Sequence, residues 1–312
     1  MSRRAAIAEA EARLRQLCCL GLPGPVIAPA VFRELNAVLP FETCFHMWIG
    51  PDGPCDAYFD NPEAGPRFAL YRDEICHPSG GDVFLRVMVR DGAVPVGAYN
   101  VARLTRDRDF DADDLRTLRR LEPYLAHALR TRDEPATPET CTAERVIVVV
   151  DQVAEVRWRS PEADRLLSLA NGHAVAAARL PEGLLRAVQA WVEITREQAD
   201  AKVPVWRHHN AWGTFVARAY PLDPTASDES LIGIELERRV PLPLVLFEAL
   251  RATSMPARQA EVGLLLALGH TQEQIAERLH VTRHTVVYHR RQIYNRLGVD
   301  SRHALQERLL HH

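Results

Sequence analysis

Hydrophobic and polar positions alternate with two different periods along the chain, which predicts a mixture of helices and strands. Residues 5–20 place Ile7, Ala10, Leu14 and Leu17 on one face of a helix. Shorter apolar runs, each bounded by Gly, Pro or Asp, have the length and flanks that are typical of strands. We therefore expect an α+β fold.

The strand-like runs fall into two groups, which predicts two antiparallel sheets. The first group lies at 45–49, 83–89 and 95–101, after a short second helix that we expect to begin at Val31. The second group begins at 146–150 and 153–158 and returns at 203–208, 213–220 and 231–237. We expect Pro241 and Pro243 to break the chain there, before a connecting helix at 246–252.

A strong helical stripe follows the first group of strands. Its apolar residues stand at 115, 118, 121, 125 and 129, which makes one continuous face. Such a face either covers the sheet of its own domain or pairs with the same helix of a second subunit. We expect a mixture of the two arrangements.

A polar stretch with two prolines at 130–140 is typical of a linker and separates the two groups. We predict a domain at 1–132, a linker at 133–143, a second domain at 144–240, a linker helix at 241–253 and a helical domain at 254–312. The element order in 144–240, with Asp151 and the segment Trp158 to Ala163, resembles a PAS domain. Residues 1–132 resemble a GAF or PAS-like sensor.

Helix signals follow one another closely in the last sixty residues or so of the chain. An amphipathic helix over 255–268 ends at Gly269, as helices often do at glycine. Thr271 and Gln274 then form a capping box, so a second helix starts here.

A third helix begins at Thr282, after a tight turn at His280 and Val281, and ends before Gly298. Two helices joined by a short turn, the second rich in polar side chains, meet the physical requirement for reading a major groove. One face of the third helix is apolar and holds it to its scaffold: Val286, Ile293 and Leu297. The other face is available for base edges: His284, Val287, Tyr288, Arg291 and Asn295.

This segment resembles the LuxR-type (LuxR/FixJ/NarL-like) helix-turn-helix domain, in register and without gaps. The matching residues are Glu261-Val262, Gly269, Ile275-Ala276, Leu279, Val281-Thr282, Thr285-Val286, His289, Ile293 and Leu297-Gly298-Val299, with Ser301-Arg302 at the family's fourth helix. The resemblance implies an all-α domain of four helices that binds DNA. The family usually has lysine where this chain has Val287, and a valine there suits a thymine methyl group better than a phosphate.

The predicted DNA contacts are Thr271, Thr282, Arg283, His284, Thr285, Val287, Tyr288, Arg290, Arg291 and Asn295. Thr271 and Thr282 are helix caps first, and the amides exposed beside them can also hold phosphates. We expect His289 to pack within the domain.

Charge is unevenly distributed in a way that supports DNA binding. The chain carries a net charge of −3, which divides into +3 over residues 253–312 and −6 over the rest. A basic module on an acidic body indicates that only the module meets a polyanion. Because Lys202 is the single lysine, the chain has neither a GxxxxGK[ST] phosphate loop nor a kinase lysine motif.

Other candidate chemistry is sparse. The six cysteines show neither CxxC nor Cys/His ligand spacing, so we predict no metal site, no disulfide framework and no cofactor. The chain lacks GxSxG and HExxH motifs and paired carboxylates, so we do not expect an enzyme. Aromatic residues of the first domain are candidates for a ligand pocket, as well as for an ordinary core: Phe45, Trp48, Tyr58, Phe68 and Tyr71.

The sequence therefore predicts a transcription regulator whose N-terminal domains couple a small-molecule effector or a partner to operator binding by a homodimer. We expect helix 301–310 to form the dimer contact on double-stranded DNA, and RNA polymerase is a further candidate partner. With no apolar run long enough to span a membrane and no signal-peptide core, a cytoplasmic location is expected. Two alternatives remain: an enzyme with a DNA-binding tail, and a ligand-binding scaffold whose tail contacts protein.

Overall fold

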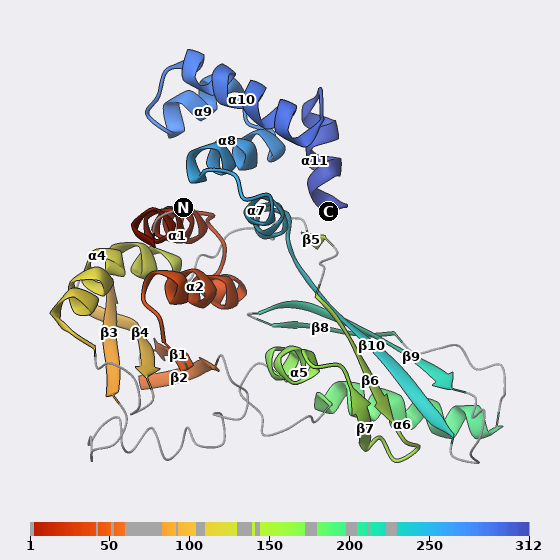
Figure 1. The fold of residues 1–312 in the computed structure, drawn as a ribbon. Helices are drawn as coiled ribbons and strands as arrows, with labels where there is room; N and C mark the ends of the chain where they lie inside the picture. Colours follow the sequence, from red (N-terminus) through yellow and green to blue (C-terminus); the bar gives the residue numbers. More distant parts are fainter. Residues whose placement is uncertain are drawn as a thin grey trace.

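The computed structural model describes residues 3–41, 43–50, 53–59, 83–91, 93–103, 110–129, 139–140, 144–171, 180–197, 205–210, 212–222 and 230–311. Within these ranges the chain forms two sheets, each with helices packed against it, and a group of helices at the C-terminal end (Figure 1). The mixed helix and sheet architecture is the expected one. No helix in the described part of the chain is long and apolar enough to cross a membrane.

The first sheet has the strand order β2-β1-β4-β3, and each of its pairings is antiparallel. Its strands are β1 (Thr43–Gly50), β2 (Gly53–Phe59), β3 (Val83–Asp91) and β4 (Val94–Arg103). The helices that accompany this sheet are α1 (Arg3–Cys18), α2 (Gly24–Val38) and α4 (Ala112–Leu129). They pack on one another, and α4 contacts β3 and β4, so the apolar stripe of each helix meets a partner within the same chain.

The stripe on α4 follows one of the two arrangements that we expected to be mixed. Leu118, Leu121 and Leu125 are fully buried within the single chain, where α4 contacts β3, α1 and α2. Burying a leucine side chain stabilises a fold by roughly 1.5–3 kcal/mol. The stripe therefore covers its own domain rather than a second subunit.

Helix α2 begins earlier than the sequence pattern predicts. We expected it from Val31, whereas the helix starts at Gly24 with Pro25 in its first turn. Proline is tolerated there because the first amides of a helix have no partner within it. The proline-containing segment after α1 thus ends one helix and opens the next.

The second sheet has the order β7-β6-β10-β9-β8, with the short β5 pairing beside the far end of β10. Its strands are β5 (Glu139–Thr140), β6 (Arg145–Val150), β7 (Val156–Arg159), β8 (Val205–Asn210), β9 (Gly213–Leu222) and β10 (Leu231–Pro241). Helices α5 (Ala163–Asn171) and α6 (Glu182–Glu197) accompany it. Alternate residues such as Val148, Ile234 and Leu236 are buried, which is the period-two pattern of a sheet with one covered face.

Strand β10 leads directly into helix α7 (Leu242–Ala252), with no break between them. The sequence suggested that Pro241 and Pro243 would interrupt the chain. Instead, Pro241 is the last strand residue and the N-cap of α7, and Pro243 stands in the first turn of that helix. Because proline suits both positions, the connection is a strand joined to a helix (Figure 1).

Arg238, near the end of β10, ties the second sheet to helix α2. Its guanidinium is almost completely buried and donates to the Trp212 carbonyl (2.8 Å), the Glu144 carboxylate (3.0 Å) and the Val26 carbonyl (2.8 Å). Burial alone would raise the pKa of the Glu144 carboxyl, but Arg238 and Arg165 hold it below its usual value. The charge is thus matched on several sides, as a buried ion requires.

Glu34 of α2 forms a second junction, this time with α7. Its side chain is fully buried, accepts a hydrogen bond from Arg13 of α1 at 2.8 Å and a second one from Arg251 of α7. On the surface beside it, Arg33 of α2 pairs with Glu248 of α7. Helix α7 is therefore held to the first domain by two charged groups of α2, Arg33 and Glu34.

Replacing Arg238 tests the first junction. Arg238→Met leaves the buried Trp212 and Val26 carbonyls without their donor and takes one of two arginines from Glu144, so we expect the free energy of unfolding to fall by about 3–5 kcal/mol. The measurement is urea unfolding of the full chain followed by far-ultraviolet circular dichroism. Arg165→Met is the matched control, because that more exposed arginine pairs with the same carboxylate at 3.2 Å, and we expect a loss below about 1 kcal/mol. Equal losses would contradict the role given to Arg238.

Candidate nucleic-acid interface

The four C-terminal helices form a small domain of their own: α8 (Ala257–Ala267), α9 (Gln272–Arg278), α10 (Arg283–Leu297) and α11 (Arg302–Leu310). Each contacts at least one of the others, and α11 also contacts α7. The side chains between them are fully or almost fully buried: Val262, Ile275, Val286, Ile293, Leu305 and Leu309. This core fixes α10 on the outside of the domain.

Short-range signals place the ends of these helices. The Thr271 hydroxyl accepts from the Gln274 amide at 3.2 Å, and the Gln274 side chain accepts from the Thr271 amide at 2.8 Å, which is a complete capping box. Thr282 caps α10 by accepting from the Thr285 amide at 3.2 Å. At the other end, Gly298 has φ of 65°, a left-handed conformation that glycine adopts at little cost.

Between α9 and α10 the chain makes the tight turn that the sequence predicts. His280 has φ of 50°, which is uncommon for a residue other than glycine. The amide of Val281 donates back to the Ala276 carbonyl at 2.9 Å and so closes the end of α9. The turn lets α9 and α10 pack against each other, as the two helices of a helix-turn-helix unit do (Figure 1).

Helix α10 has one inward and one outward face. Val286 and Ile293 are fully buried, while Tyr288 is 56% exposed and lies on the other side. The predicted contact residues that are exposed are Thr271, Thr282, Arg283, His284, Tyr288, Arg291 and Asn295. The remaining ones, Thr285, Val287 and Arg290, are half-buried. The structure thus brings His284, Val287, Tyr288, Arg291 and Asn295 to one accessible side of α10, while Arg283, Thr285 and Arg290 lie at its flanks.

One exposed residue of this face is absent from the sequence prediction. Gln292 follows Tyr288 by four positions, so it lies one turn along the same side of α10. Its spacing of four residues from Tyr288 could have predicted this position from the sequence.

Three of the eight arginines in residues 253–312 bond to backbone carbonyls. Arg258 donates to the Leu279 carbonyl (2.8 Å), Arg296 to the Thr253 carbonyl (3.2 Å) and Arg302 to the Gly269 carbonyl (3.0 Å). These carbonyls stand at or just beyond helix ends, where backbone acceptors lack helical partners. The three arginines therefore help to hold the domain together. The positive charge available to bind a polyanion is smaller than the net charge of the domain suggests.

Arginines on and near the exposed face have weaker attachments. Arg283 pairs with Glu273 at 2.7 Å, and both side chains are largely exposed, so solvent screens the pair. The guanidinium of Arg290 lies 5.8 Å from the centre of the Tyr294 ring. Arg291 is exposed.

His289 packs inside the domain, as expected. Its side chain is half-buried, and this burial, with the charge of Arg258 nearby, lowers the pKa of the imidazole below its usual value. A neutral ring at neutral pH is a poor partner for phosphate. His289 therefore belongs with the packing residues of α10.

Three of the aromatic residues predicted to line a pocket in the first domain lie on two paired strands. Phe45 and Trp48 lie on β1, and Tyr58 lies on the neighbouring β2, where its backbone pairs with His46. Phe68 and Tyr71 fall outside the described residues. Among the residues that the structure does describe, no cluster of three His, Cys, Asp or Glu side chains is placed to hold a metal ion.

Comparison with known proteins identifies the C-terminal helices. Residues 253–307 match the model of the bacterial regulatory proteins of the luxR family, so this segment is a LuxR-family helix-turn-helix domain. The matched family consists of regulatory proteins, not of enzymes.

More distant likenesses extend beyond this domain. The probable transcriptional regulatory protein SgaR of Hyphomicrobium methylovorum is 37% identical over 95 residues, which are 30% of this chain and 43% of that relative. The chain thus spans less than half of the relative's length. A solved structure of the Vibrio cholerae VqmA dimer, described as a LuxR-type receptor, covers 54% of this chain and 83% of its own at 14% identity, with a TM-score of 0.23. A superposition as loose as this supports no argument about the present chain.

Removing the cap of α10 tests how its first turn is held. Thr282→Ala deletes the hydroxyl that accepts from the Thr285 amide, so we expect the local opening free energy of the first turn to fall by about 1 kcal/mol. Hydrogen exchange of peptides from 282–290 measures this change. Thr282→Ser keeps the oxygen and should exchange like the natural chain; a serine variant as weak as the alanine one would disprove the cap.

Proposed function

We propose that this protein is a transcription regulator that binds double-stranded DNA by inserting helix α10 into the major groove. The observation that carries the proposal is the two-sided character of α10: Val286 and Ile293 anchor it to the domain, and the opposite face is polar and exposed. A major groove admits a helix of this kind and offers base edges to its side chains.

Individual contacts follow from the chemistry of the exposed groups. Arg291 suits the two acceptors of a guanine edge, Asn295 suits the donor and acceptor of an adenine edge, and Val287 suits a thymine methyl. Phosphates would meet Arg290 and the amide groups beside Thr271 and Thr282, because the first amides of a helix carry partial positive charge.

The rest of the chain acts as the sensing part in this proposal. We assign 1–132 and 144–240 to GAF/PAS-like domains that take a small-molecule effector or a partner, and 241–253 to the connection with the DNA-binding domain. Support comes from the two antiparallel sheets and from the direct passage of β10 into α7. A strand continuous with a helix transmits a displacement that a flexible linker would absorb.

We further infer that the protein binds DNA as a homodimer held by the second sheet. Helix α11 buries Leu305 and Leu309 within its own chain, so apart from Leu310 (38% exposed) its exposed side is polar or charged: Arg302, His303, Glu307 and Arg308. By contrast, the outer face of the second sheet shows Ile147 (58% exposed), Trp158 (58%) and Tyr220 (40%). Large exposed apolar groups on one surface mark an interaction site.

The register of the strands shows that these residues form rows across the sheet. Trp158 pairs with Val149, which pairs with Gly233, which in turn pairs with Tyr220. In the next row Ile147, Glu235, Arg218 and Val205 stand side by side. Because Glu235 ion-pairs with Arg145 at 3.1 Å, opposite charges are mixed on this face and two copies of it would not repel one another. A second copy of the chain is the occupant we propose.

DNA binding is tested with the double variant Arg290→Ala, Arg291→Ala and a labelled mixed-sequence duplex at low ionic strength. Losing two cations at the groove should weaken affinity by roughly tenfold or more and reduce the slope of log affinity against log salt by about two. Fluorescence anisotropy at several salt concentrations gives both quantities.

The control for this experiment is Arg116→Ala, Arg119→Ala, which removes the same charge from two exposed positions of α4, outside the DNA-binding domain. It should bind like the natural chain. If the α10 variant also binds like the natural chain, the protein does not contact DNA through this helix. That result would favour the alternative of a ligand-binding scaffold whose C-terminal helices contact protein.

The dimer is tested with Trp158→Arg. A charge in place of an aromatic residue at the centre of an interface should raise the dimer dissociation constant by roughly thirtyfold or more, measured by sedimentation equilibrium. Val153→Arg is the matched control, since Val153 is also exposed and apolar but lies in the turn between β6 and β7. A natural chain that stays monomeric with and without DNA would exclude the dimer.

A further inference from the structure

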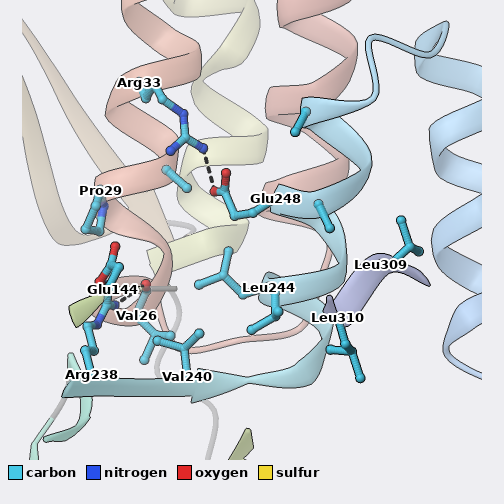
Figure 2. Close-up of a pocket in the computed structure, with 14 residues that line it drawn as sticks. Val26, Pro29, Arg33, Glu144, Arg238, Val240, Leu244, Glu248, Leu309 and Leu310 are labelled. Carbon is cyan, nitrogen blue, oxygen red and sulfur yellow. Dashed lines mark hydrogen bonds and ion pairs between the residues drawn. The ribbon is translucent and has the colours of Figure 1, made fainter. Parts of the chain in front are cut away.

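A cleft lies where helix α2, the passage from β10 to α7, and the end of α11 meet (Figure 2). Its volume is about 490 Å³, which lies within the range of small-molecule sites in proteins. Its walls come from segments far apart in the sequence, among them Val26 on α2, Leu244 on α7 and Leu310 on α11. The cleft is separate from the exposed face of α10 and from the aromatic residues of the first sheet.

Apolar side chains dominate the walls. Ten of the fourteen lining residues are apolar, and on α2 and α7 they include Ala30 and Ala249, whose small size leaves the space open. Leu310, at the mouth, is 38% exposed although its neighbour Leu309 is buried. A molecule in the cleft would remove apolar surface of α2, α7 and α11 from water at the same time, which is favourable in proportion to the area covered.

The four charged residues of the lining are already paired. Arg238 and Glu144 hold each other at 3.0 Å, and Arg33 on α2 pairs with Glu248 on α7, as Figure 2 shows. The two pairs leave the walls without net charge. A charged ligand would have to break a pair and strand the displaced partner in a partly buried place, which is costly. A neutral ligand meets no such cost, and the half-exposed Arg33–Glu248 pair can still exchange a hydrogen bond with a hydroxyl or carbonyl group.

We propose that this cleft is a binding site for an uncharged, mainly apolar small molecule, of the size of two or three fused or linked rings. The site does not depend on the proposed DNA binding. Only the effect of the ligand on regulation rests on the proposed function. A bound ligand would contact the first domain and the DNA-binding domain at the same time, and would therefore change how the two domains pack against each other.

The test uses the neutral dye N-phenylnaphthylamine on the full chain, in the absence of DNA. We expect its fluorescence to rise and saturate with one site. Anilinonaphthalene sulfonate has the same rings with an added negative charge, and we expect it to bind roughly tenfold more weakly. No saturable signal from the neutral dye, or equal binding of both dyes, would overturn the proposal.

Location is tested with Ala249→Phe and Ala252→Phe, which add bulk to the α7 wall. Both should weaken binding of the neutral dye by roughly tenfold or more, because the added rings occupy the cleft. Ala252 is exposed, so its variant keeps the test valid if the more buried Ala249→Phe fails to fold. Ala6→Phe, a half-buried alanine on α1 outside the lining, is the control and should bind like the natural chain.

If the dye instead binds on the outer face of the second sheet, Trp158→Arg will weaken its binding and the α7 variants will not. This result would overturn the proposal that the cleft is the binding site. The readout contains no DNA, and the α7 variants leave α10 unchanged. Failure of DNA binding and failure of the cleft are therefore separate results.

Discussion

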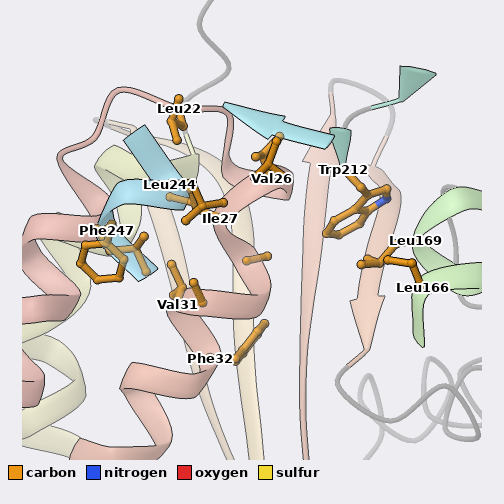
Figure 3. Packing of buried hydrophobic residues seen from close by; sticks show 14 of the residues in the cluster. Leu22, Val26, Ile27, Val31, Phe32, Leu166, Leu169, Trp212, Leu244 and Phe247 are labelled. Carbon is orange, nitrogen blue, oxygen red and sulfur yellow. The ribbon is translucent and has the colours of Figure 1, made fainter. Parts of the chain in front are cut away.

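Buried charge at the two ends of helix α2 is the constraint on which the arrangement of this molecule depends. Arg238 reaches α2 from the second sheet, and Glu34 receives Arg251 from α7. A guanidinium or carboxylate that leaves water is stable only when its neighbours replace the lost hydration, so each of these groups fixes the position of several segments at once. Apolar residues of α2 such as Val26 and Ile27 are buried in the same cluster as Leu244 and Phe247 of α7 (Figure 3).

The position of the DNA-binding domain follows from this junction. Helix α7 continues β10 without a loop and packs against α8 and α11, so the two-sided helix α10 is carried on a connected series of rigid elements. The cleft beside α7 lies between the same elements, because its walls come from α2, β10, α7 and α11. In the function proposed here, sensing and DNA binding share this junction, and a change in its packing moves both parts.

Much of the DNA-binding domain could be predicted from the sequence because its signals are local. Thr271 with Gln274, Thr282 with Thr285, and Gly298 act within one turn of the chain, and the helices begin and end where these residues indicate. The assignment of charge was less successful. Arg258, Arg296 and Arg302 add to the positive charge that suggested DNA binding. In the structure, however, they bond to carbonyls that only the folded domain brings near them.

The sequence by itself determined the helix and strand content, the alternation of buried residues in the second sheet and the polar face of α10, since periodicity and capping act over a few residues. Tertiary structure alone decided that Val26 and Arg238, 212 residues apart, share a hydrogen bond, and that the α4 stripe covers its own domain. It also decided that α2, α7 and α11 enclose a cleft. Contacts of this range depend on how complete elements pack, and no local pattern of residue types encodes that packing.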